Sequence, residues 1–199
     1  MTANDNTVNI KPRSARYHHG DLRAALIEEG LSQIAQLPAE RVSLREIARQ
    51  AGVSATAVYR HFPDKAALFG ALCEAGDEKL SAAFRAAMDE TDGGVEAFEA
   101  MGRAYVRFAL ANPSLFRLMM TNAPQAHVMD PDESMDGGAF AMLAETLRDL
   151  MPEDTPQDLR LTRRIQAWSV VHGLAMLMLD GQVPADEALI SRIVCSSFL

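Results

Sequence analysis

The sequence predicts an all-α protein in which a small N-terminal helix-turn-helix unit precedes a larger helical body. Abundant Ala, Leu, Met, Glu and Arg residues favour helix, and no convincing alternation of apolar and polar residues predicts a strand. Apolar residues recur instead at helical spacing, between recognisable start and stop signals. The 199 residues, 48% of them hydrophobic, suffice for a sizeable core.

The formal net charge of −8 is distributed unevenly along the chain. Residues 1–75 carry nine Lys and Arg against eight Asp and Glu, whereas residues 76–199 carry ten against nineteen. An acidic body repels nucleic acid and thereby orients the approach of a DNA-binding head. The same balance argues against a protein that coats DNA without specificity.

The sequence gives no sign of a metal site, a cofactor site or a membrane segment. Cys73 and Cys195 lie far apart without a CxxC motif, so neither zinc nor a disulfide is expected. The N-terminus lacks the apolar core of a signal peptide. The most apolar stretch, 165–179, is too short and too polar to span a bilayer. We therefore expect a cytoplasmic protein with reduced thiols and no membrane partner.

Residues 1–16 are polar, and we expect them to form a disordered basic arm. Either this segment is only a leader, or Arg13 and Arg16 reach phosphates or a minor groove, as basic arms do in other DNA-binding proteins. Asp21 is expected to cap a first helix over residues 22–36. The side chains expected in the core from this helix are those of Leu22, Ala25, Leu26, Leu31 and Ile34.

Residues 42–61 have the pattern of a helix-turn-helix. Ser43 and Glu46 predict a capping box at the start of its first helix. Gly52 follows the last periodic residue, where a helix ends in a left-handed turn. The apolar face of this helix is formed by Leu44, Ile47, Ala48 and Ala51.

The second helix of this unit is predicted to be very short. Ser54 is expected to cap it, and it should end near Arg60, because the residue before Pro63 is pushed out of the α region. Val58 and Phe62 can then face the core. A helix this short persists only against its neighbour, because nucleation is costly. The main use of such a pair is to present one face to a DNA major groove, and the alternative is an ordinary helical hairpin with solvated residues.

The outward side chains of this second helix suit contact with DNA. Small Ala55 and Thr56 allow close approach, and their methyl groups can touch thymine. Tyr59, His61 and Lys65 offer groups that bind phosphate oxygens.

The stretch from Tyr17 to about Leu80 resembles the N-terminal domain of the TetR family of bacterial one-component repressors. The motifs that carry the resemblance are Leu-Arg-Glu-Ile-Ala (44–48), Ala-Gly-Val-Ser (51–54), Val-Tyr-Arg-His-Phe (58–62) and Asp-Lys-Ala-Ala-Leu (64–68). The resemblance implies a DNA-binding domain over residues 17–65, in which Arg45 and the outward residues read bases. The side chain of Ala55 cannot hydrogen-bond a base, so we expect few direct hydrogen bonds between α-helix side chains and base edges. The full set of candidate DNA-binding residues is Ser43, Arg45, Ser54, Ala55, Thr56, Tyr59, Arg60, His61 and Lys65.

The body is expected over residues 66–199, as a domain for ligand binding and dimerisation. A long helix from about Asp64 to Met88 begins in the head and ends in the body, so it is the natural mechanical link between them. Residues 89–94 predict a break, and Asn112-Pro113 opens a short helix. The remaining elements are predicted as helices over 95–111, 139–151, 156–180 and 185–198 and a loop over 122–137.

Aromatic and methionine side chains are concentrated in the body, and their pattern permits two interpretations. They form an ordinary packed core, or they line a ligand cavity between helices, to which flexible methionines are well suited. The candidate ligand-binding residues are Phe98, Met101, Tyr105, Phe116, Met120, Met142, Trp168, His172 and Met176.

Trp168, His172 and Gly173 resemble the signature of a TetR C-terminal subclass named for Trp, His and Gly. The Tyr-His-His-Gly-Asp-Leu-Arg run (17–23) and the Asn-Pro-Ser-Leu-Phe-Arg-Leu-Met run (112–119) accompany that signature. His172 is either a hydrogen-bonded core histidine or a ligand contact, and metal binding by it alone is not expected.

The last two helices are apolar on more than one face, which predicts a second partner for them. Leu174, Leu177 and Met178 cannot share the side of Trp168. The same pair of helices from another subunit would complete a four-helix arrangement. The apolar residues expected from the final helix are Ala188, Leu189, Ile193 and Val194.

These features together predict a homodimeric, TetR-like transcriptional regulator. We expect a repressor that binds a double-stranded, palindromic DNA operator and is released when an unknown, mostly apolar small molecule tilts the helix over residues 64–88. The alternative is a DNA-binding regulator controlled by a protein partner or by no ligand. An enzyme is not expected, because the sequence has no nucleophile–base pair, metal-ligand spacing or glycine-rich phosphate loop.

Overall fold

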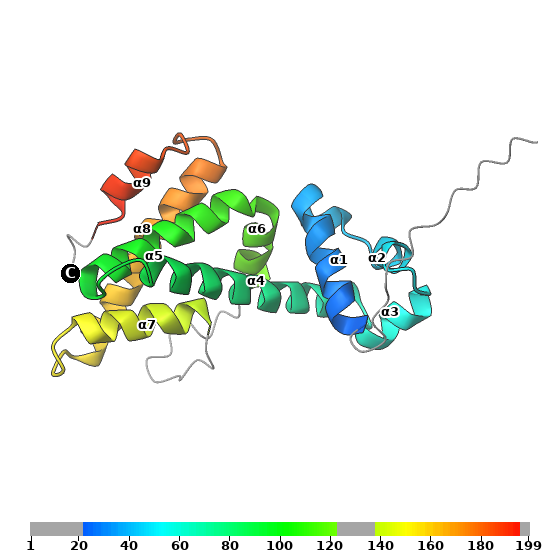
Figure 1. Ribbon diagram of the computed structural model, residues 1–199, viewed down its shortest axis with the longest axis horizontal. Coiled ribbons are helices and arrows are strands. Elements are labelled where there is room, and N and C mark those ends of the chain that lie inside the picture. Colours follow the sequence, from blue (N-terminus) through cyan, green and yellow to red (C-terminus); the bar gives the residue numbers. More distant parts are fainter. Residues whose placement is uncertain (1–21, 123–137, 196–199) are drawn as a thin grey trace, which may run out of the picture.

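A computed structural model describes residues 22–122 and 138–195 of the chain. These residues form nine α-helices and one short 3-10 helix, and no strand occurs among them. The predicted all-α class is therefore confirmed. Figure 1 shows the two parts of the molecule: a small head of α1–α3 at one end, a larger body at the other, and α4 running between them. The predictions for the arm, including Arg13, Arg16 and Asp21, lie outside the described residues.

The head consists of α1 (Leu22–Gln36), η1 (Ala39–Arg41), α2 (Leu44–Gln50) and α3 (Ala55–His61) around one apolar core. Ala25 was expected in this core but is exposed. Gly30 is buried on this helix, and an added Cβ there would lie 2.9 Å from Leu72 Cδ2 of α4. The absence of a side chain therefore lets α1 cross α4 closely. The most deeply buried core side chains of the head are Leu26, Ile34, Ile47, Val58 and Phe62.

The two helices of the helix-turn-helix begin in different ways. The predicted capping box is wrong: the Ser43 side chain makes no capping hydrogen bond, and Glu46 instead accepts from Arg49 and Gln50. The backbone N–H of Ser43 donates to Gln33 Oε1 of α1 at 3.3 Å, so a side chain from another helix fixes this end.

The turn and the second helix agree with the prediction. Gly52 has a φ of +69°, as expected for a left-handed helix end. The Ser54 hydroxyl caps α3 by accepting from Ala57 N at 3.2 Å. Val58 and Phe62 face the core.

The body contains six further helices, and α5 lies at their centre. These are α4 (Lys65–Met88), α5 (Gly94–Ala111), α6 (Pro113–Asn122), α7 (Ala139–Leu150), α8 (Gln157–Leu179) and α9 (Glu187–Ile193). Their predicted positions are confirmed, except that α9, expected over residues 185–198, ends at Ile193 because Val194 leaves the helical conformation. Most of the predicted loop, residues 123–137, lies outside the described residues. No helix in the described ranges is long and apolar enough to cross a membrane.

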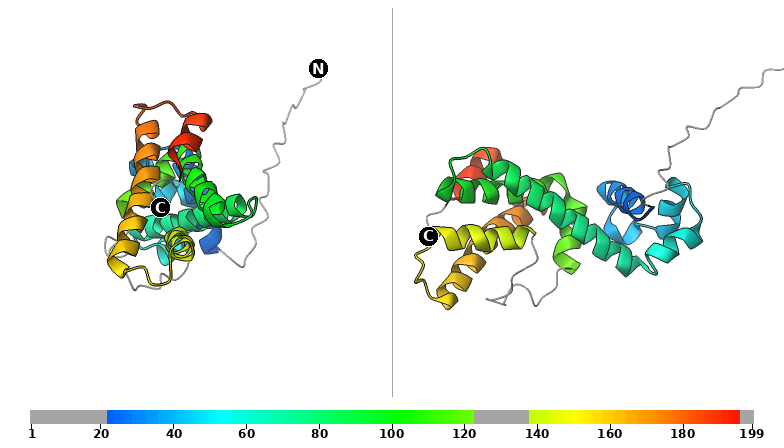
Figure 2. Two further views of the ribbon diagram at one scale, coloured as in Figure 1. Left: turned by 90° about the vertical axis from the view of Figure 1, so that its left-hand side faces the viewer. Right: turned by 60° about the horizontal axis from the view of Figure 1, so that its bottom comes forward.

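Two helices connect the body to the head. The right-hand view of Figure 2 shows α4 continuing without a break from the head into the body. Its first turns bury Leu68 and Leu72. α6 packs against both α4 and α1. At Gly76 the two body helices approach so closely that an added Cβ would lie 2.6 Å from the Met119 sulfur.

Candidate DNA-binding surface and ligand cavity

α3 presents one face to solvent and the other to the core of the head. Val58 and Phe62 are buried beneath it, and Ser54 is the cap of the helix. The five candidate residues that α3 itself carries are all exposed. They are Ala55, Thr56, Tyr59, Arg60 and His61.

The other candidate DNA-binding residues lie on the neighbouring elements. Arg45 is exposed in the first turn of α2, and Ser43 is half-buried just before it. Lys65 is the first residue of α4, where its Nζ donates to the carbonyl oxygen of Glu40 at 2.7 Å and lies over the Phe69 ring. Lys65 is thus held in place, and two further N–H donors remain for other acceptors.

Gln33 was not predicted, although it positions the helix-turn-helix. It is buried on α1 and accepts the hydrogen bond from Ser43 N. Its Nε2 has no partner among the described residues. A lone glutamine on the apolar face of a helix is the only sign of this role in the sequence.

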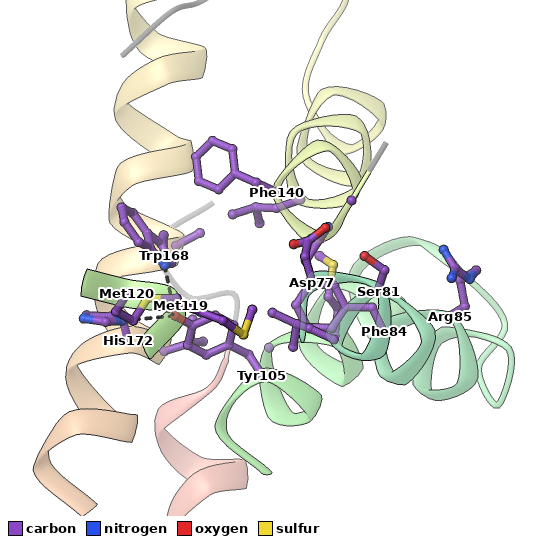
Figure 3. A pocket seen from close by; sticks show the side chains of 18 of the residues that line it. Asp77, Ser81, Phe84, Arg85, Tyr105, Met119, Met120, Phe140, Trp168 and His172 are labelled. Atoms are coloured by element: carbon purple, nitrogen blue, oxygen red, sulfur yellow. Dashed lines mark hydrogen bonds between the residues drawn. The ribbon is translucent and has the colours of Figure 1, made fainter. Parts of the chain in front are cut away.

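The body contains a cavity of about 800 Å³, whose walls include α4, α5, α7 and α8. Figure 3 shows Asp77 and Ser81 from α4 on one side and Trp168 and His172 from α8 on the other. Six of the nine residues predicted to bind a ligand line it. They are Phe98, Met101, Tyr105, Met120, Trp168 and His172.

The other three predicted residues do not line the cavity. Phe116 is completely buried behind the wall, with its ring edge-on to Tyr105 at 5.5 Å between centroids. The sulfur of Met142 faces Arg85 Nη1 at 3.8 Å. Met176 lies one turn beyond His172, where α8 has left the cavity and the side chain packs against the core.

Three polar side chains of the wall satisfy one another. The Trp168 indole N–H donates to Tyr105 Oη at 3.1 Å. Because an indole can only donate, the Tyr105 proton is free to point to His172 Nδ1, which lies at 3.0 Å. This arrangement requires an unprotonated Nδ1, and burial correspondingly lowers the pKa of His172. Burial also raises the pKa of Tyr105 to about 12, so this side of the cavity is polar but uncharged.

Sequence reasoning missed the charged and hydroxyl-bearing residues of the wall formed by α4, and Asp77 and Ser81 are the two of them that are not exposed. The Asp77 carboxylate accepts from Ala139 N, at the start of α7, at 3.3 Å. Ser81 lies one turn further along α4, and its buried Oγ has no partner within the described residues. An aspartate and a serine on a long helix normally indicate a solvated face, so the sequence offered no signal for either.

Three large apolar side chains on α8 and α9 are exposed to solvent, and one of them, Leu159, lies in the first turn of α8 and is 41% exposed. Leu177 is 42% exposed and Ile193 is 39% exposed. Leu174, Met178 and Val194 were predicted to need a second partner, but they are buried within the protomer, where α8 and α9 pack against α5. Ala188 is exposed and Leu189 is half-buried.

The described residues contain no group of three His, Cys, Asp or Glu side chains that could hold a metal ion. Cys73 and Cys195 are both half-buried, unbridged thiols. Burial raises the pKa of the Cys73 thiol to about 11, so it is a poor nucleophile near neutral pH.

Both the head and the body of the protein match known protein families. Residues 26–72 match the family described as "Bacterial regulatory proteins, tetR family". Residues 98–194 match the "Tetracyclin repressor-like, C-terminal domain". A relative from Vibrio vulnificus (strain YJ016) is 30% identical over 163 residues, which span 80% of this chain and 76% of that protein. The chain belongs to the TetR family.

The proteins to which this chain is similar carry different names. The Vibrio vulnificus protein is called "Nucleoid occlusion factor SlmA". A solved structure of a protein with unknown function from Rhodococcus sp. RHA1 is 29% identical, with a TM-score of 0.69 over 90% of this chain and 93% of that one. The fatty acid degradation regulator FadR from Bacillus halodurans has a TM-score of 0.59 over 86% of this chain and 95% of that one. Its identity is 15%, so this likeness shows the fold alone.

Membership of the TetR family makes this protein a DNA-binding transcriptional regulator. The candidate DNA-binding residues all lie inside the matched N-terminal segment. The matched C-terminal segment does not distinguish the Trp-His-Gly subclass, so that assignment stays a prediction. Residues 73–97 lie between the two matches, and they include Asp77 and Ser81 of the cavity wall.

Proposed function

We propose that this TetR-family protein is a homodimeric repressor that leaves a palindromic operator when a small, mostly apolar molecule fills the cavity. The observation that carries the proposal is the cavity of about 800 Å³ beside α4. Ligand pockets of this size are usually apolar with a few placed polar groups. Here, the helix that forms one wall of the cavity also begins beside α3.

The DNA-binding mode follows from the exposed face of the helix-turn-helix. α3 would enter the major groove with Ala55 and Thr56 closest to the bases, and Arg45 would contribute from α2. Tyr59, an exposed residue, and Lys65 would hold phosphate oxygens. The small side chains at the start of α3 leave much of the specificity to Arg45 and to the shape of the DNA.

Dimerisation would join the outer faces of α8 and α9 from two protomers. The exposed Leu177 and Ile193 supply apolar contacts, and no charged residue occurs between Arg164 and Asp180. An uncharged helix face that carries exposed apolar side chains is typical of a helix–helix interface. A twofold dimer would then place two copies of α3 on two half-sites of the operator.

The coupling between ligand and DNA would run through α4 and α6. Both helices line the cavity, α6 through Met119 and Met120, and both pack against α1 in the head. A molecule held between α4 and α8 can change the angle of α4, and with it the separation of the two heads. It can do so only to the extent that it binds the two arrangements with different affinity.

The function can be tested in two steps with the full-length protein. First, DNA retained from a random pool at physiological salt identifies the operator, which should be a palindrome. Second, compounds that raise the melting temperature of the protein, as ligands do by mass action, are added to the complex. We expect such compounds to lower operator affinity. A pool that yields no preferred sequence would refute the operator part, and bound compounds without effect on DNA would refute the release part.

A second candidate function is a DNA-binding protein controlled by a protein partner. The observation in its favour is the name "nucleoid occlusion factor", carried by relatives of up to 30% identity. If no compound in the thermal screen binds and operator affinity responds instead to an added protein, this alternative replaces the small-molecule proposal.

A further inference from the structure

The charged groups around the cavity are predominantly acidic. Its lining includes the carboxylates of Glu74, Asp77, Glu78 and Glu99 and one guanidinium, that of Arg85. Arg85 lies two turns beyond Asp77 on α4 (Figure 3). Its Nη1 contacts the Met142 sulfur. A lining of this kind attracts cations and repels anions, most strongly where low-dielectric walls focus the field.

Asp77 differs from the other three carboxylates in its position and its partners. Glu74 and Glu78 are exposed to water, and Glu99 forms an ion pair within α5. Asp77 is half-buried, and no ion pair links it to a cation in residues 22–122 and 138–195. Its described hydrogen bonds come from the backbone N–H of Ala139, at 3.3 and 3.4 Å. Burial raises its pKa, which means that the ionised form lacks part of the stabilisation that water would give.

Ser81 adds an unpaired polar atom to the same wall. Its side chain is only 3% exposed, and its Oγ has no hydrogen-bond partner among the described residues. A buried hydroxyl in this state retains the full cost of lost hydration. Because Asp77 and Ser81 are four residues apart on α4, they lie on one face of the helix.

The opposite side of the cavity is uncharged and also carries aromatic rings. Figure 3 shows Trp168 across the cavity from Asp77, with Phe140 of α7 beside Trp168. The two rings meet edge to face at 5.7 Å between centroids. Aromatic faces pack against apolar groups and also attract cations, and the Arg164 guanidinium already lies over the Phe140 ring, 5.3 Å from its centroid. The rings of this side are therefore suited to the apolar part of a ligand.

We propose that the effector is an amphiphilic organic cation, with its ammonium group at Asp77 and Ser81 and its apolar body against Trp168 and Phe140. This inference rests on the proposed function and adds the chemical class of the effector to it. An ammonium group has three N–H donors and no acceptor, which matches a carboxylate together with a hydroxyl oxygen. A bound cation also pairs a half-buried negative charge that no other described side chain neutralises.

The class of effector can be tested with three probes of one shape. 4-Phenylbutylamine, 4-phenylbutan-1-ol and 4-phenylbutanoate share a phenyl ring and a chain of the same length, but differ in the charge of the end group. We expect calorimetric titration of the full-length protein at neutral pH to show the amine binding about tenfold tighter than the alcohol. The carboxylate should bind more weakly than either. Equal affinities for all three probes, or tighter binding of the carboxylate, would overturn the proposal.

Two matched variants assign the selectivity to Asp77. Asp77→Asn keeps an oxygen that can accept from Ala139 N, but removes the charge. Glu78→Gln removes the charge of the adjacent, exposed carboxylate. We expect Asp77→Asn to weaken amine binding about tenfold and to leave alcohol binding unchanged, whereas Glu78→Gln should change either affinity by less than about twofold. Unchanged amine binding in Asp77→Asn would contradict the assignment.

The same probes separate failure of this inference from failure of the proposed function. If the alcohol binds as well as the amine and both lower operator affinity, the regulator is controlled by an apolar effector and the cationic class is wrong. If none of the three probes binds, the cationic class is wrong, and compounds from the thermal screen still test the proposed function.

Discussion

At the scale of single residues, the cavity differs from an ordinary helical core in the pairing of its polar groups. Trp168, Tyr105 and His172 satisfy one another through two hydrogen bonds. Ser81 Oγ has no partner within the described residues. The side of the cavity formed by Trp168, Tyr105 and His172 therefore needs no ligand to complete its hydrogen bonds. The side formed by α4 carries an unpaired hydroxyl, whose desolvation cost a ligand can remove.

Replacing Ser81 by alanine should stabilise the ligand-free protein, because it removes a buried hydroxyl that makes no described hydrogen bond. We expect a gain of about 1 kcal/mol in the free energy of unfolding, measured by urea denaturation. Ser32→Ala, at an exposed position in the middle of α1, is the control for helix propensity alone, which contributes about 0.5 kcal/mol. A gain in Ser81→Ala no larger than that of Ser32→Ala would mean that the hydroxyl is satisfied.

His172 should make stability depend on pH. Its pKa is lowered in the folded protein by burial, so the unfolded chain binds the proton more readily. The contribution of His172 to the free energy of unfolding is therefore fully present above its pKa in the unfolded chain, about 6.5. It is lost as the pH falls from there through the pKa of His172 in the folded protein. Asp77 has the opposite effect on stability, because burial raises its pKa. Its contribution to stability is present at low pH and is lost as the pH rises through its folded-state pKa.

The contribution of His172 can be isolated by comparison with His172→Gln, which keeps an acceptor for the Tyr105 hydroxyl. Urea denaturation between pH 5 and 8 should show a decline in wild-type stability below about pH 6.5 that is smaller in the variant. Parallel pH profiles would show that His172 is protonated equally in the folded and unfolded states.

At the scale of helices, the candidate residues on α3 and its neighbours α2 and α4 fall into two groups that should contact DNA in different ways. Tyr59→Ala and Lys65→Ala should weaken binding to all sequences alike, because phosphates carry no sequence information. Arg45→Ala and Thr56→Ala should instead relax the preference at particular base pairs, by about 1–3 kcal/mol each. Fluorescence anisotropy with the selected operator and single-base variants distinguishes the two patterns. Unchanged affinity in both Tyr59→Ala and Lys65→Ala at physiological salt would show that α3 docks differently.

The helices themselves could be predicted because their signals are local. Gly52, Ser54 and Pro113 act on residues within one turn, and each has its predicted effect. The capping box at Ser43 failed because Gln33, ten residues earlier, takes the hydrogen bond of its backbone. No sequence pattern within α2 itself indicates this hydrogen bond from a residue on α1.

The cavity was only partly predictable, because a helical stripe does not show where a helix leaves a cavity. The stripe on α8 correctly included Trp168 and His172 but also Met176, which lies past the end of the lining. Asp77 was missed for the opposite reason: a carboxylate on a helix usually faces water, and only the packing of α7 against α4 half-buries it.

At the scale of the whole molecule, an exposed face on α8 and α9 predicts a twofold dimer. Leu177→Glu and Ile193→Glu should each give monomers with strongly reduced operator affinity, because a charge would be buried in the interface and a palindrome needs two heads. Val95→Glu, at a position on α5 that is 46% exposed, is the matched control and should remain dimeric. Sedimentation analysis checks both. A wild-type protein that is monomeric at micromolar concentration would rule out this mode of assembly.

The claim that a ligand in the cavity lowers operator affinity can be tested by a titration. Operator affinity is followed while a compound that raises the melting temperature is titrated into the wild-type protein and into Met120→Trp, whose larger side chain fills part of the cavity. We expect the wild-type affinity to fall at least about tenfold, a coupling of about 1.4 kcal/mol, and the variant to respond much less. Saturation of the wild-type cavity with no change in operator affinity would contradict the claim.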